Sequence, residues 1–225
     1  MRKLTLVVCL FVSFLSGALS AEGSYPKVRS VAGSVQVLEP SGRWWRPLLK
    51  EAIFRKGSAV RTGTDGAVEI AFDDHLNDIL RLGPDSRMNF LNPKDASIHL
   101  LLERGRLFVL REREEPSQAA PLTVLTRHFL VEMRLGGCGL ETSERRTAVR
   151  VFSESLQVLD LNRDHPRSTP RVIAEGLKYF SGVSAVPAVI RRMAYADYGE
   201  WRLWMKEMYT AQDDRAVDYL EKISE

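Results

Sequence analysis

The feature that most constrains this chain is an alternation of apolar and polar side chains with a period of two, interrupted at short intervals by glycine-rich turns. Val31, Gly33, Val35 and Val37 share one face of a first stretch. Val68, Ile70 and Phe72 form another, the turn Gly83–Ser86 follows, and the pattern runs through residues 28–179. Successive side chains of a β-strand point to opposite faces, so each stretch has one packed face and one wet face. The pattern predicts a mainly β domain of many short strands, antiparallel or wrapped, arranged as a sandwich or a short solenoid-like stack.

A small residue followed by a strand recurs three times in this region, at Gly33–Val37, Gly105–Val109 and Ser155–Leu159. The spacing between the three copies is uneven, which argues against a strict solenoid. We interpret them as strand-and-turn units that stack on one another.

After Pro187 the period changes to that of a helix. We expect a helical segment over residues 187–198 that Gly199 ends or kinks, and a last helix opened by Thr210 and Asp213. Between them, one helical face carries apolar side chains at i, i+3, i+4 and i+7: Trp201, Trp204, Met205 and Met208.

This helical stripe has two interpretations. Trp201 and Trp204 could dock on a partner protein, or the stripe could lie against the β domain and cover an apolar edge. We favour internal packing, because terminal helices are commonly tied down in this way. The β domain is then residues 22–182, and the helical tail is residues 183–225.

Residues 1–21 have the layout of a secretory signal peptide. Arg2 and Lys3 precede an apolar run over residues 4–15, and small residues follow up to Ala21. The apolar run is too short for a comfortable membrane span. We therefore expect export to the periplasm or the cell exterior, with cleavage at the end of this segment and no membrane span afterwards. An uncleaved signal that acts as an anchor is the alternative.

The charge balance argues against nucleic acid as a partner. The chain has 32 Lys and Arg and 29 Asp and Glu, a net charge of +3, and two of the basic residues are Arg2 and Lys3. Without these two the opposite charges nearly cancel, so a phosphate backbone would find little long-range attraction.

Several short motifs follow one another along the β region: Gly33–Val37, Trp44 or Trp45, Pro47-Leu48, Gly57, Val60–Gly63, Gly66–Phe72 and Leu82–Ser86, followed by the looser elements Gly105–Leu107 and Glu175–Tyr179. In their order and spacing the chain resembles the FecR-like domain over residues 28–179. Three positions depart from the family pattern: Ser58 replaces the usual acid, Gly136–Gly139 replaces a Gly-Thr step, and Ser155 replaces a glycine.

The resemblance implies an extracytoplasmic β domain that works by contact with other proteins. The family's namesakes relay a signal from an outer-membrane iron-siderophore receptor to a cytoplasmic sigma factor, through a cytoplasmic segment and a membrane span. This chain opens with a predicted signal peptide instead. We therefore expect the fold and the contact function, without the sigma-regulating arm or the iron-specific role.

Trp44 and Trp45, flanked by Arg43 and Arg46, form an aromatic and basic cluster. Such residues can anchor a peptide or stack on a sugar ring. Adjacent strand residues point in opposite directions, so we expect one tryptophan in the core and the other on the surface.

The sequence contains no recognisable catalytic motif: it has no nucleophile elbow, zinc-protease pair or phosphate loop. The cluster Asp73–Asp78 could bind a divalent ion, but acids after a strand are ordinary turn material, and this is the interpretation we favour. Cys138 and His128 lack further members of a triad. Cys138 is also the only cysteine beyond the signal segment, so we expect a buried, inert thiol. We expect no catalytic residue, no metal site and no cofactor.

The sequence thus predicts a non-enzymatic binding module outside the cytoplasm, in protein–protein contact within the cell envelope as part of a signalling or envelope assembly. The candidate binding residues are Trp44, Trp45, Arg43, Arg46, Trp201 and Trp204. Two alternatives stay open: a domain that binds cell-wall or surface glycan through the tryptophan pair, and a hydrolase with an unrecognised site.

Overall fold

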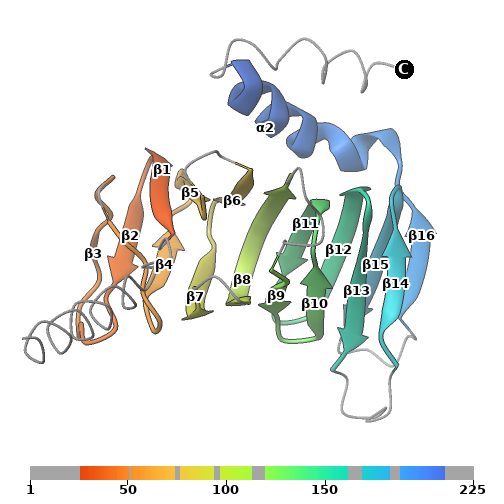
Figure 1. The fold of residues 1–225 in the computed structure, drawn as a ribbon, viewed down its shortest axis with the longest axis horizontal. Coiled ribbons are helices and arrows are strands. Elements are labelled where there is room, and N and C mark those ends of the chain that lie inside the picture. Colours follow the sequence, from red (N-terminus) through yellow and green to blue (C-terminus); the bar gives the residue numbers. More distant parts are fainter. Residues whose placement is uncertain are drawn as a thin grey trace, which may run out of the picture.

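The computed structural model describes residues 26–50, 52–73, 77–93, 97–112, 120–161, 169–182 and 188–210. The predicted signal peptide and the predicted helix after Thr210 lie outside the described residues. Within them, sixteen strands form one open, mixed sheet that folds back on itself into two layers, and a C-terminal helix lies across one layer (Figure 1). The predicted mainly β fold with a C-terminal helix is confirmed.

The two layers share one strand, β8. Layer A runs, in spatial order, through β1 (Lys27–Ala32), β5 (Ala67–Ala71), β6 (Asp78–Leu82), β8 (Ile98–Arg111), β11 (Gly136–Thr142), β12 (Arg146–Ser153), β15 (Leu177–Gly182) and β16 (Val189–Arg192). Layer B has β8 at its centre and runs through β3 (Arg46–Pro47), β2 (Val35–Leu38), β4 (Ala59–Thr62), β7 (Arg87–Asn92), β8, β9 (Leu122–Leu125), β10 (Phe129–Met133), β13 (Ser155–Asp160) and β14 (Arg171–Ala174).

The long strand β8 joins the two layers. Its first half pairs with β7 and β9 in layer B, and its second half, from Gly105 onward, pairs with β6 and β11 in layer A. Every pairing is antiparallel except that of β8 with β9, which is parallel.

Strands are added to both layers in nearly the same order as they occur in the sequence. The colours of Figure 1 therefore run from red at one end of the long axis to blue at the other. The predicted stacking of strand-and-turn units is correct in this sense, and sequence position translates directly into position along the molecule.

One hydrophobic core fills the space between the layers. It combines inner-face side chains of layer B, such as Phe90 and Phe129, with those of layer A, such as Ile70 and Tyr179. Phe90 stacks on Phe54 with ring centroids 4.4 Å apart, and Phe129 packs against Tyr179 at 4.9 Å. Burial of these alternating positions supplies the hydrophobic driving force for the two-layer arrangement.

The chain changes layer at residues with left-handed backbone conformations. Among the described residues seven have positive φ, and six of them lie where the chain passes between layers: Gly33, Asp85, Gly105, Gly136, Glu154 and Gly176. At Gly33 (φ 59°) a Cβ would lie 2.2 Å from the carbonyl oxygen of Asp65, and at Gly105 (φ 94°) it would lie 2.1 Å from Ser86 Oγ. Glycine is required at both positions for conformation and for space.

Gly33 also corrects one expectation. The apolar residues Val31, Val35 and Val37 suggested one continuous strand, but the turn at Gly33 divides them between β1 in layer A and β2 in layer B. A period of two cannot reveal such a turn, because the alternation continues through it.

A buried hydrogen-bond network holds three of the layer-crossing turns together. The Thr62 hydroxyl donates to the carbonyl oxygen of Gly83 at 2.6 Å and accepts from the Ser86 N–H at 2.9 Å. The Arg106 N–H in turn donates to Ser86 Oγ at 2.9 Å. These side chains satisfy backbone groups that the sharp turns remove from the sheet ladders.

The C-terminal region differs from its predicted boundaries. Residues 187–198 were expected to be helical, but Val189–Arg192 is strand β16, which pairs with β15. A 3-10 turn, η3 (Tyr195–Tyr198), follows, and helix α2 (Gly199–Thr210) begins at the glycine that was expected to end a helix. The sheet thus extends beyond residue 182. Within the described part of the chain no helix has the length and apolarity of a membrane span.

Replacement of Gly105 by alanine tests the role of the layer crossing. The change forces a Cβ into the Ser86 turn and into an unfavourable φ, so we expect a loss of at least about 2 kcal/mol in unfolding free energy, measured with urea. Gly199→Ala is the matched control, because Gly199 has helical φ and an alanine Cβ there would meet no atom within 4 Å. A loss no larger for G105A than for G199A would contradict this role.

A buried ion pair ties the ends of β8 and β6 together. Arg111 Nε and Nη2 donate to the two carboxylate oxygens of Asp78 at 3.1 and 3.0 Å, and the two side chains are 1% and 2% exposed. Arg111 Nη1 also donates to the carbonyl oxygens of Ala120 and Met133. The pair is thus bidentate and its remaining donors are used, which is what a buried pair needs to offset desolvation.

Arg111→Met should lower the unfolding free energy by about 3 to 5 kcal/mol, because it leaves the Asp78 carboxylate buried without its cation. The double variant Asp78→Leu/Arg111→Met should recover part of that loss, since no buried charge remains. Urea unfolding of the single and double variants measures both effects. Asp78→Leu alone provides the comparison. If the stability losses of the two single variants simply add in the double variant, the two side chains do not interact, and charge burial is not the cause.

Candidate interaction surfaces

Helix α2 covers the outer face of layer A, where it buries the apolar stripe noted in the sequence. Trp201, Trp204, Met205 and Met208 are all buried, together with Tyr209, in a second hydrophobic cluster outside the main core. The layer contributes Ile79, Leu110 and Phe152 to this cluster. The internal-packing interpretation is confirmed, and the docked helix cannot offer Trp201 or Trp204 to a partner.

Two glycines of β11 make room for the helix. Gly137 and Gly139 lie on the outer face of the strand, and Cys138 points into the main core. A Cβ at Gly137 would lie 2.5 Å from the Trp201 ring, and one at Gly139 would lie 3.0 Å from Phe108. The missing side chains therefore form a depression that aromatic rings fill. Trp201 itself stacks on Phe152, with ring centroids 4.5 Å apart.

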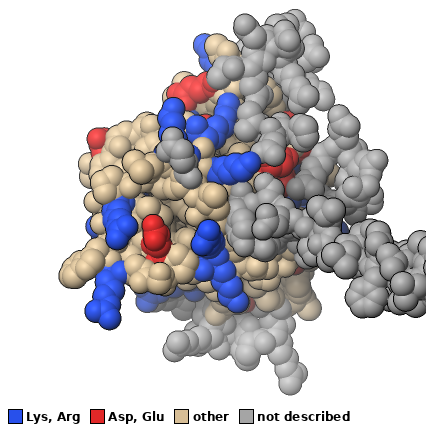
Figure 2. Space-filling model, turned by 60° about the vertical axis from the view of Figure 1, so that its left-hand side comes forward, with Lys and Arg blue, Asp and Glu red and all other residues tan. Residues whose placement is uncertain are grey.

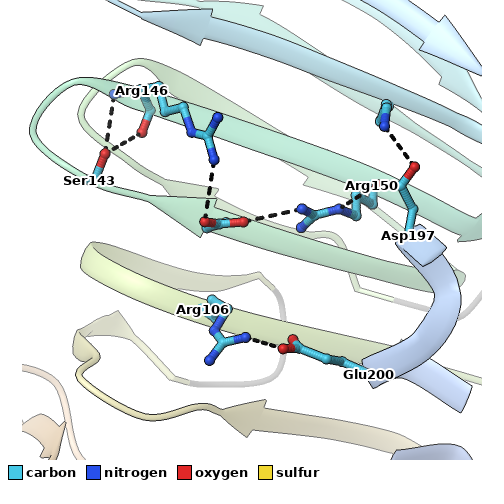
Figure 3. Close-up of polar contacts among 8 residues, drawn as sticks. Arg106, Ser143, Arg146, Arg150, Asp197 and Glu200 are labelled. Carbon is cyan, nitrogen blue, oxygen red and sulfur yellow. Dashed lines mark hydrogen bonds and ion pairs between the residues drawn. The ribbon is translucent and has the colours of Figure 1, made fainter. Parts of the chain in front are cut away.

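Ion pairs fix the beginning of the helix to layer A, as Figure 3 shows. Glu200 pairs with Arg106 of β8, and Asp197 pairs with Lys178 at 2.6 Å and with Arg150 at 3.5 Å. Arg150 also contacts Glu141 at 3.2 Å, which extends the network to β11. Burial alone would raise the pKa of Asp197, but the Lys178 hydrogen bond, the Ala194 N–H and the two cations hold it below its ordinary value.

Further polar contacts fix the rest of the helix. Trp204 Nε1 donates to Glu69 Oε1 at 2.7 Å, Arg81 pairs with Glu207 at 2.6 Å, and the Tyr209 hydroxyl donates to Glu112 at 3.0 Å. The helix therefore contacts layer A from β5 to β15 and forms a third layer of the fold.

The two N-terminal tryptophans occupy different surroundings, and neither is in the core. Trp44 is 78% exposed. Trp45 is half-buried on the outer face of layer B, where the guanidinium groups of Arg61 and Arg87 lie 4.5 and 5.2 Å from its ring centre. The expectation of one core tryptophan is wrong, because β3 is a two-residue edge strand with little inner face. Arg43 and Arg46 are both exposed beside the pair.

A shallow groove of about 300 Å³ lies at the opposite end of layer B. Its lining comes from β10, β13 and β14 and their connections: Glu132, Met133, Arg134, Leu135, Glu154, Ser155, Leu156, Gln157 and Val172. The residues that reach it from the outer face are mostly polar. None of the binding residues proposed from the sequence lines it.

The described acidic residues that were considered for metal binding have structural roles. The Asp73 carboxylate accepts from the Asn77 N–H at 2.9 Å, as expected of a turn, and Asp78 belongs to the ion pair with Arg111. Asp74 and His75 lie outside the described residues. Among those that are described, no group of three or more acidic, histidine or cysteine side chains could hold a metal ion.

Cys138 is fully buried in the core, and burial raises the pKa of its thiol to about 12. Its Sγ contacts Met133 Sδ at 3.5 Å, and His128 lies in a separate turn next to Thr126. The thiol therefore stays protonated at neutral pH and is a poor nucleophile. The thiol is buried as expected, and its inertness stays a prediction.

Comparison with known proteins agrees with the two-layer fold. Residues 58–157, fewer than half of the chain, match the family model described as FecR protein. The chain contains a FecR domain. The match begins just before β4 and ends within β13, so it includes the layer-crossing turns at Ser86 and Gly105. No curated protein matches the sequence.

Two crystal structures of a protein from Parabacteroides distasonis, proposed to be an anti-sigma factor, resemble this fold. Their TM-scores are 0.52 and 0.51 at 13% and 12% sequence identity, over 64% of this chain. The alignment covers 63% of that protein's chain, so this chain matches less than two thirds of its length. At this identity the likeness establishes the fold. No enzyme family appears among the matches, and the FecR family points to a non-catalytic role in regulation or protein contact.

The glycines Gly136–Gly139 were noted in the sequence as a departure from the FecR pattern. The structure gives their purpose in this chain: Gly136 turns the chain between layers, and Gly137 and Gly139 accommodate the rings around Trp201. Two glycines on one face of a strand, together with a tryptophan-bearing helix later in the chain, were a signal for this packing that the sequence analysis did not use.

Gly137→Val should displace α2 from the FecR domain without unfolding it, because the valine side chain would overlap the Trp201 ring while suiting a β-strand. We expect a red shift of tryptophan fluorescence and faster proteolysis within residues 199–210, with the far-UV circular dichroism of the sheet retained. Trp201→Ala in the same chain removes the overlap, so the G137V change should then accelerate proteolysis far less. Equal acceleration in both backgrounds would contradict the steric explanation.

Proposed function

We propose that this chain is an extracytoplasmic, non-enzymatic contact module, which binds an extended segment of another cell-envelope protein along strand β14. The signal-peptide features of residues 1–21 and the FecR domain support the extracytoplasmic setting and the contact role. The observation that carries the proposal is the open edge of layer B.

Both layers end at the same end of the molecule in four-residue strands, β14 and β16, which pair on one side only within the described residues. An unpaired sheet edge offers backbone N–H and C=O groups to another chain. Charged side chains commonly protect such edges, and β16 carries Arg191 and Arg192 in exposed positions. β14 carries one charged residue, Arg171, and beside it the exposed Val172, with 65% of its surface accessible.

The groove next to β14 supports the same site. Val172 forms part of its lining, and the outward-facing Glu132, Arg134 and Gln157 provide polar partners on the neighbouring strands. A strand added beside β14 would place every second side chain over this face. There the Glu132 carboxylate, the Arg134 guanidinium and the Gln157 amide could bind these side chains. The backbone would supply the affinity, and the groove would supply the specificity.

The other functions considered from the sequence gain no support from the geometry. The guanidinium groups of Arg61 and Arg87 already contact the Trp45 ring, so a sugar would have to compete with them for it. The buried Cys138 thiol and the Asp78–Arg111 pair are committed to the core. A protein-contact role therefore remains the function that the site supports best.

A photo-reactive amino acid placed at position 172, in cells that make the protein, tests this proposal. We expect one discrete cross-linked envelope protein from position 172 and none from position 203. The Leu203 position is the matched control, because it is an exposed apolar residue on the outer face of α2. The added substitution Ala174→Pro, at another position of β14, should abolish the cross-link by disturbing the edge backbone. A failure to cross-link from position 172, or the same product from both positions, would overturn the proposal.

A further inference from the structure

The positive charge of this chain is concentrated near one end, although opposite charges nearly cancel in total. Residues 26–62 hold eight Lys and Arg and two Asp and Glu, a net charge of +6, whereas the whole chain carries +3. Spatial order follows sequence order, so these residues gather at the end of the molecule that contains β1 to β4. We call this end the basic lobe. Figure 2, which turns this end forward, shows Lys and Arg predominating over Asp and Glu on the visible surface.

The cations of the basic lobe are available to a partner. Arg43, Arg46, Lys50, Arg55 and Lys56 are all exposed, and none of them forms an ion pair with a described residue. Next to the helix, cations such as Arg150 and Lys178 are instead tied to Glu141 and Asp197. The uncompensated charge of the basic lobe would attract an anionic surface.

The same lobe exposes three large apolar side chains within ten residues of one another. Trp44, Leu49 and Ile53 are 78%, 67% and 51% exposed. Trp44 and Leu49 flank the two-residue edge strand β3, and Ile53 forms a β-bridge with Lys27 of β1. Tryptophan has a favoured place at the level of lipid headgroups, because its ring is apolar and its N–H can remain hydrogen-bonded. Exposed apolar tips among cations are the composition of surfaces that lie on anionic membranes.

We propose that the basic lobe binds the surface of an anionic phospholipid bilayer, with Trp44, Leu49 and Ile53 entering the headgroup region and the surrounding Lys and Arg contacting the phosphates. A fluid bilayer requires no preformed cavity, and the groove lined by β10, β13 and β14 lies at the other end of the molecule. An acidic protein or a soluble polyanion would use the cations but would gain little from the three separate apolar tips. Membrane attachment through this lobe would leave the β14 edge pointing away from the bilayer.

Vesicle binding by the purified protein tests the proposal. The protein is produced from the full-length sequence, and its N-terminus is determined by mass spectrometry, so that all variants are compared with the same terminal residues. We expect binding to phosphatidylcholine vesicles that contain phosphatidylglycerol, much weaker binding to phosphatidylcholine alone, and loss of binding at high salt. Brominated lipid should quench tryptophan fluorescence, and Trp44→Phe should remove more of that quenching than Trp45→Phe, because Trp44 is the exposed ring, Trp45 is half-buried, and Trp201 and Trp204 are buried.

Matched charge variants locate the surface. Arg43→Gln/Arg46→Gln/Lys50→Gln should weaken vesicle binding roughly 100-fold, at about fivefold for each cation near an anionic surface. Arg171→Gln/Arg191→Gln/Arg192→Gln removes the same charge from exposed positions at the opposite end and should change binding little. Far-UV circular dichroism and urea unfolding check that both triple variants fold.

Three results would overturn the proposal. One is a failure of the wild-type protein to bind phosphatidylglycerol vesicles beyond the neutral ones. Another is an equal loss of binding in both triple variants, which would indicate a general charge effect. The third is binding to soluble polyglutamate as tight as that to vesicles, without quenching of Trp44 by brominated lipid, which would point to an acidic macromolecule instead. None of these results bears on the β14 edge, because the cross-linking test uses the other end of the molecule.

Discussion

Everything in this structure depends on the sharp turns that carry the chain from one layer to the other. A strand and its successor can face each other across a core only if the backbone reverses within a few residues, and at most crossings it does so through a left-handed residue. Gly105 is the clearest case, since it redirects a single strand from layer B into layer A while Ser86 lies against it. The network of Thr62 and Ser86 then satisfies the backbone groups of neighbouring crossings.

The same geometry explains how the surfaces are distributed. Because strands are added in chain order, a local bias in the sequence becomes a local property of the surface: the basic residues of positions 26–62 gather at one end, and the last strands of both layers leave open edges at the other. The outer face of layer A is closed by α2, whose tryptophans fill the space above Gly137 and Gly139. The described part of the fold is therefore left with its two ends and the outer face of layer B for contacts.

Sequence reasoning predicted the elements that depend on local periodicity. It missed the features that depend on contacts with strands distant in the sequence. The alternation around Val68 and Ile70 and the stripe of Trp201 and Trp204 were read correctly, because each follows from one strand or one helix. The break at Gly33 and strand β16 were missed, since a turn that preserves the period, or a short strand rich in arginine, has no distinct pattern. The surroundings of Trp45 were missed for a similar reason: Arg61 and Arg87 come from strands that only the fold places beside it.

The central claim is that helix α2 is an integral third layer of this fold rather than a loosely attached tail. Native-state hydrogen exchange, followed by NMR, tests it most directly. The account predicts that the backbone amides of α2 and the indole N–H of Trp204, which donates to Glu69, exchange at rates close to those of β8 and β11, because they open only with the sheet. Exchange of the α2 amides several orders of magnitude faster, while β8 and β11 stay protected, would contradict it.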